Sequence, residues 1–97
     1  MDKRATLKLL NEHGPEIRER FGVKRLALFG SVARGDAGAD SDVDVLVEFE
    51  EATTFRGYMG LKFYLEDLFQ KPVDLVTEAG LRPVFRPYVE EDAIEIS

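Results

Sequence analysis

The stretch FGSVARGDAGADSDVDVLVEF, at residues 29–49, decides how this chain is interpreted. A glycine and a serine, Gly30 and Ser31, follow one apolar run, and an aspartate pair, Asp42 and Asp44, opens the next. Apolar residues recur at every second position after Asp42, which is typical of a strand with one buried face. The sequence therefore predicts two neighbouring strands joined by a polar loop, with both aspartates on one face of the second strand.

Outward from this stretch, the apolar spacing predicts a succession of helices and strands. In chain order we expect a helix at Arg4–Phe21, a strand at Val23–Phe29, a short helical turn at Ser31–Arg34, a strand at Val43–Phe49, a helix at Phe55–Phe69, a strand at Val73–Val76, a helix at Leu81–Asp92 and an extended end at Ile94–Ile96. The expected fold class is α+β, a small mixed β-sheet with helices packed over it.

Local signals mark the ends of several of these elements. Gly14-Pro15 interrupts the first helix, which is expected either as two short helices or as one helix with a kink. Gly22 is a residue type that commonly ends a helix in a left-handed conformation. Ser31 is expected to cap the short helical turn. The chain should therefore turn sharply at both ends of the first strand.

The composition limits the class of protein. The 97 residues suit a single domain, 1–97, and the 44% hydrophobic content is ordinary for a globular protein. No cysteine is present, which excludes disulfides and thiolate metal sites. The net charge of −6 argues against direct nucleic-acid binding, which favours a basic face. Because no apolar run resembles a signal peptide or a membrane span, we expect a cytoplasmic protein without membrane contact.

The aspartates are candidate metal ligands. Asp42 and Asp44, two apart in a strand, share a face with Cα atoms about 6.5 Å apart. Such carboxylates repel unless a cation lies between them, and Mg²⁺ is commonly held by one or two carboxylates together with substrate phosphates. Asp74, inside the apolar run VDLV, could reach the same face, and three carboxylates around two metal ions suit phosphoryl transfer. The alternative is that these aspartates lie on solvated strand faces.

The glycine–serine turn is a candidate phosphate site. Gly30 lets the backbone approach a ligand closely, and the turn that follows Ser31 presents backbone N–H groups to an anion. Arg34 could add a charge-assisted contact to a phosphate. The alternative is a plain tight turn, with Arg34 paired to a neighbouring aspartate.

Together these parts resemble a known signature. Gly30-Ser31-Val32-Ala33-Arg34-Gly35 and Ser41-Asp42-Val43-Asp44 are similar to the G-S-x-A-R-G and S-D-x-D motifs of the minimal nucleotidyltransferases, or MNT proteins. These belong to the DNA polymerase beta-like nucleotidyltransferase superfamily, and the resemblance covers almost the whole chain. It implies the polymerase beta-like fold and two groups of site residues: nucleotide-binding Gly30, Ser31 and Arg34, and catalytic, metal-ligating Asp42, Asp44 and Asp74.

The resemblance also implies an activity and a partner. MNT proteins transfer a nucleoside monophosphate from a nucleoside triphosphate to a hydroxyl, so ATP is expected as donor and Mg²⁺, as two ions, as cofactor. They are commonly paired with a HEPN-domain RNase toxin, and the MNT antitoxin can add AMP to a tyrosine of that toxin. Two alternatives stay open: an antitoxin that neutralises its partner by binding alone, and a nucleotidyltransferase acting on a small molecule or an RNA end.

Overall fold

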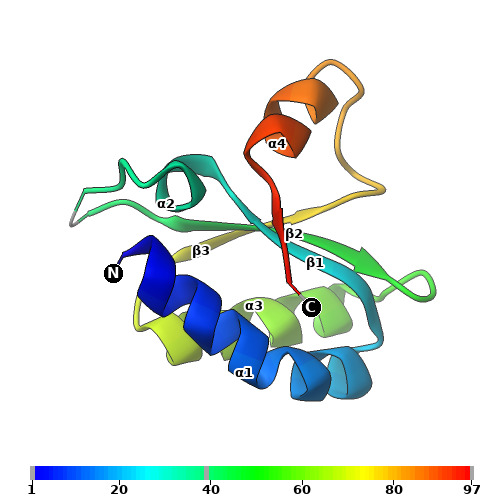
Figure 1. Cartoon of the computed structure of the whole chain (residues 1–97). Helices are drawn as coiled ribbons and strands as arrows, with labels where there is room; N and C mark the ends of the chain where they lie inside the picture. Colours follow the sequence, from blue (N-terminus) through cyan, green and yellow to red (C-terminus); the bar gives the residue numbers. More distant parts are fainter. Residues whose placement is uncertain (1, 39, 97) are drawn as a thin grey trace.

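Helices and strands alternate along the computed structural model, which describes residues 2–38 and 40–96 (Figure 1). The elements are α1 (Lys3–Phe21), β1 (Val23–Phe29), α2 (Gly30–Arg34), β2 (Val43–Phe49), α3 (Phe55–Phe69), β3 (Val73–Thr77), α4 (Arg86–Asp92) and β4 (Ile94–Glu95). The predicted α+β class, with helices over a small mixed sheet, is confirmed. Within the described ranges, no helix is both long enough and apolar enough to cross a membrane.

The four strands form one sheet in the order β3-β2-β1-β4. β2 runs antiparallel to β1 and parallel to β3, and β4 pairs antiparallel with β1. The register sets Asp44 of β2 opposite Phe29 on one side and opposite Asp74 on the other. Strand β2 thus brings the end of β1 and the start of β3 close together.

The apolar face of the sheet is covered by α1 and α3, which lie together on one side of it (Figure 1). The core there is formed by fully buried side chains from these two helices and from β2: Leu10, Ile17, Leu61, Leu65, Val43, Val45 and Val47. Because side chains alternate along a strand, Asp44 and Glu48 point to the other face. Leu46 shares that second face and is also fully buried, where α4 lies across the sheet from α1 and α3 (Figure 1).

The first helix is continuous. Of the two forms expected for the Gly14-Pro15 segment, the structure has a single helix that includes Pro15. Asp2 caps the N-terminus by accepting a hydrogen bond of 2.8 Å from the N–H of Ala5. Gly22 ends the helix in the left-handed conformation, at φ 65°, as the sequence predicted.

Two expectations about helix starts are wrong. The predicted helix at Leu81–Asp92 begins only at Arg86, because Pro83 disfavours a helical residue before it, whereas Pro87 fits the first turn of α4. Ser31 does not cap the short helix after β1. That helix, α2, starts one residue earlier at Gly30, and no side chain caps it.

Candidate active site

Gly30 brings the end of β1 directly against the side chain of Asp44. The glycine has φ 76°, in the left-handed region that favours glycine over other residues. A Cβ atom at this position would lie 2.1 Å from Oδ2 and 2.9 Å from Cγ of Asp44. The glycine is therefore needed twice: for the turn itself, and to leave room for the carboxylate beside the backbone.

Asp42, Asp44 and Asp74 gather on the face of the sheet opposite α1 and α3. Asp42 directly precedes β2 and is exposed, Asp44 is half-buried, and Asp74 is exposed on β3. Parallel pairing of β2 with β3 puts Asp74 level with Asp44, so their side chains share a face. The structure thus brings together the three aspartates that the sequence singled out.

The electrostatics of Asp44 show how close the other carboxylates are. Burial first, and then the negative charges of Asp74 and Asp42, raise the pKa of Asp44 above its ordinary value, while the positive charge of Arg34 opposes the rise. The surroundings of Asp44 therefore disfavour its ionised form. A cation next to these carboxylates would reverse that balance.

The donor set fits a magnesium ion that is shared with a phosphate. Among the described residues no three carboxylate, histidine or cysteine side chains converge closely enough to enclose a metal ion by themselves. Mg²⁺ seldom needs such a cage, since one or two carboxylates, waters and substrate phosphates complete its octahedron. Asp44 beside Gly30, with Asp42 and Asp74 next to it, offers that partial set at the point where the glycine turn leaves space.

Arg34 lies at the end of α2 and is engaged in two ion pairs. Its guanidinium donates to Oδ2 of Asp36 at 3.2 Å and to Oδ2 of Asp92 at 2.7 Å. Pairing of Arg34 with a nearby aspartate is the alternative that the sequence left open, and the phosphate contact stays a prediction. Asp92 belongs to α4 and was not recognised from the sequence, because nothing in its own neighbourhood signals a partner so distant along the chain.

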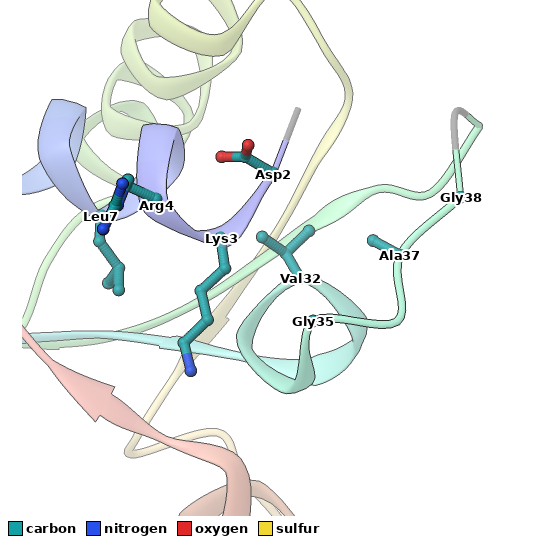
Figure 2. A pocket seen from close by; sticks show the side chains of 8 residues that line it. All are labelled: Asp2, Lys3, Arg4, Leu7, Val32, Gly35, Ala37 and Gly38. Atoms are coloured by element: carbon teal, nitrogen blue, oxygen red, sulfur yellow. The ribbon is translucent and has the colours of Figure 1, made fainter.

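A separate pocket of about 690 Å³ lies between the start of α1 and the segment that follows α2 (Figure 2). Its lining combines charged side chains at the N-terminus of α1 with small and apolar groups: Asp2, Lys3, Arg4, Leu7, Val32, Gly35, Ala37 and Gly38. None of the six predicted site residues lines it. This pocket was not predicted from the sequence, because its two walls come from segments that only the fold brings together. We propose the carboxylate cluster as the site of the chemistry, because Asp42, Asp44 and Asp74 lie there and not in this pocket.

Comparison with known proteins shows which family this chain belongs to. The model of the nucleotidyltransferase domain matches residues 10–96. The protein adenylyltransferase MntA of Thermococcus cleftensis is 47% identical over 74 residues, which cover 76% of this chain and 75% of that protein. A solved structure, proposed to be a minimal nucleotidyltransferase, is 45% identical with a TM-score of 0.82 and covers 97% of this chain and 95% of that one.

A more distant structure shares the fold. It is the MNT antitoxin in complex with the tri-AMPylated HEPN toxin of Shewanella oneidensis. The match has a TM-score of 0.68 at 18% identity and covers 92% of this chain and 70% of that chain. At this identity the likeness shows the fold alone. The family model and the close relatives together establish that this chain is a nucleotidyltransferase enzyme, and that it belongs to the minimal nucleotidyltransferases of the nucleotidyltransferase domain family.

Proposed function

We propose that this chain is an antitoxin that transfers AMP from ATP to a hydroxyl group of a HEPN-domain toxin and so neutralises it. The adenylyltransferase name of the Thermococcus cleftensis relative supports the transferred group, and the AMPylated toxin in the Shewanella oneidensis complex supports the acceptor. The observation that carries the proposal is the fit of the Asp44 carboxylate against the backbone of Gly30, level with Asp74.

The reaction is a displacement at the α-phosphorus of ATP. The acceptor oxygen forms a bond to that phosphorus, the bond to the bridging oxygen breaks, and pyrophosphate leaves. Bound Mg²⁺, held by Asp42, Asp44 and Asp74, would neutralise phosphate charge and lower the pKa of the acceptor hydroxyl. Gly30 and Ser31 receive the triphosphate through the backbone N–H groups of the turn.

We assign to Asp74 the role of meeting the acceptor. It is exposed on β3, whereas its neighbour Asp44 is half-buried against the glycine turn. A hydroxyl that approaches from solution therefore reaches Asp74 before Asp44, and Asp74 accepts its proton as the oxygen attacks. An open site of this kind admits a hydroxyl that is carried on the surface of another protein.

The test is labelling of a HEPN-domain protein as the acceptor. With Mg²⁺ and labelled ATP, we expect label on that protein with the native chain and none with Asp44→Asn. Asp40→Asn is the matched control, because it makes the same charge change in the exposed loop before the site. Full labelling by Asp44→Asn would overturn the assignment of Asp44. Absence of label with the native chain, alongside intact inhibition of the toxin, would show that binding alone neutralises it.

A further inference from the structure

The segment around α4 exposes large apolar side chains, while Arg86, Glu90 and Asp92 form ion pairs with the rest of the protein. Val84, Phe85 and Tyr88 are 66%, 53% and 69% exposed, and no residue of α4 is buried. Large apolar residues this exposed and this close together are unusual on a free monomer. We call these three residues the α4 patch.

Ion pairs hold α4 against the body of the protein. Arg86 donates to Oε1 of Glu78 at 3.3 Å, Glu90 accepts from Arg25 of β1 at 2.9 Å, and Asp92 accepts from Arg34 of α2 at 2.7 Å. In an ordinary surface helix the apolar stripe faces the core and the charges face water. Because the α4 patch faces water instead of the core, its apolar side chains are left for something outside this chain.

The α4 patch lies on the same side of the sheet as the aspartates. Arg25 and Phe29 alternate onto the same face of β1, and Phe29 pairs with Asp44, so the helix that Arg25 anchors lies over the aspartate face. At its other end α4 is tied by Asp92 to Arg34, whose charge acts on Asp44. Figure 1 shows α4 on the side of the sheet away from α1 and α3.

A second exposed aromatic pair lies on the opposite side and provides a comparison. Phe55 and Phe63 of α3 are 70% and 59% exposed, as much as the α4 patch. They belong to the helix that covers the other face of the sheet (Figure 1). A protein bound to Phe55 and Phe63 would lie on the side of the sheet away from the aspartates.

We propose that the α4 patch is the docking surface for the acceptor protein of the transfer reaction. This inference rests on the proposed function and names the surface through which the site recognises its partner. An acceptor that carries its hydroxyl on a protein surface must lie over the aspartate face, and the α4 patch is an exposed apolar surface on that side of the sheet. A nucleotide or another small acceptor would need no such surface.

The chemistry of the partner follows from the surroundings of the patch. Glu90 and Glu91, two and three positions after Tyr88, are exposed, Glu90 is also paired with Arg25, and the whole chain carries a net charge of −6. A complementary surface therefore presents an apolar socket for the two aromatic rings with basic residues around it. Buried aromatic anchors inside a charged rim are the arrangement that dominates binding energy in protein interfaces.

The test compares two double variants in steady-state transfer and in binding. Phe85→Ser/Tyr88→Ser removes the aromatic part of the α4 patch, and Phe55→Ser/Phe63→Ser removes equally exposed rings from α3. The probe is the unmodified HEPN-domain protein. For Phe85→Ser/Tyr88→Ser we expect the Kd for this protein, measured by calorimetry, to rise by about tenfold or more. The KM for this protein in the transfer reaction should rise by a similar factor. The KM for ATP and the free energy of unfolding should stay at native values, and the α3 variant should behave like the native chain.

Several results would overturn this assignment. One is an α4 variant with native Kd and KM; another is a loss of affinity confined to the α3 variant. A free chain that dimerises in sedimentation, and becomes monomeric only with Phe85→Ser/Tyr88→Ser, would show that a second copy covers the patch. If the native chain transfers no label, the proposed function fails, but calorimetry still decides whether the α4 patch binds the HEPN-domain protein.

Discussion

A Cβ atom at Gly30 would lie 2.1 Å from Oδ2 of Asp44, well inside the distance at which two atoms can coexist. The backbone turn and the half-buried carboxylate therefore occupy complementary spaces, and each depends on the other. Gly30 therefore meets two separate requirements: the left-handed backbone of the turn and the room that the Asp44 carboxylate occupies.

Gly30→Ala should abolish transfer by displacing Asp44. Gly35→Ala is a matched control, since Gly35 has φ 81° but nothing within 4 Å of its Cβ position. Both variants should lose about 1–2 kcal/mol of unfolding free energy through left-handed strain, measured in urea. Only Gly30→Ala should also lose labelling of the HEPN-domain protein. Equal activity in the two variants would contradict the steric role of Gly30.

Asp44→Asn should make the metal-free protein more stable while it inactivates the enzyme. Burial and the charges of Asp74 and Asp42 disfavour ionised Asp44, so a neutral amide removes an unfavourable charge. We expect a gain of up to about 1 kcal/mol in the free energy of unfolding at pH 7, measured in urea with EDTA present. Asp40→Asn should leave this value unchanged. A loss of stability in Asp44→Asn would mean that the carboxylate makes a stabilising contact.

Glu95 should contribute stability that disappears in acid. Its hydrogen bonds from Arg25 lower its pKa below the ordinary value, which is about 4.3 in an unfolded chain. The stabilisation is therefore present above that value and is lost as the pH falls through the folded-state pKa. Glu95→Gln should flatten the acid limb of the stability curve, followed by urea unfolding from pH 6 to about pH 3. Glu91→Gln, on the exposed side of α4, should leave that limb in place.

Arg34 should matter for the nucleotide as well as for its ion pairs. We expect Arg34→Ala to raise the KM for ATP, because a cation near the phosphates is removed. Asp92→Asn breaks the 2.7 Å pair but keeps the arginine, so its KM for ATP should stay close to the native value. An exposed pair of this type contributes little to stability, so both variants should fold. Identical ATP kinetics in Arg34→Ala and the native chain would leave Arg34 with its structural role alone.

The sequence was most informative where the pattern is local. Alternation fixed the face of Asp42 and Asp44 on β2, and Gly22 marked the end of α1. Those features depend on residues that lie close together in the sequence. The spacing also predicted a strand around Asp74, because VDLV is apolar on both sides of the aspartate.

Features that depend on distant residues escaped prediction. The start of α4 was placed too early, because Pro83 outweighed the helical spacing over 81–85. The helix start at Gly30 in place of a Ser31 cap reflects the left-handed turn that the Asp44 side chain requires. The Arg34–Asp92 pair and the pocket of Figure 2 join segments whose proximity only the complete fold creates.

The parallel pairing of β2 with β3 makes this site a late product of folding. A slip of β3 by one residue would turn Asp74 toward the helices, so the third carboxylate arrives only after α3 has packed and the native register is reached. Parallel contacts between distant segments form slowly, since the intervening chain must first be ordered. A newly made or misregistered chain would thus carry Gly30 and Asp44 without a complete active centre, and enzymatic competence would report that this strand pairing is correct.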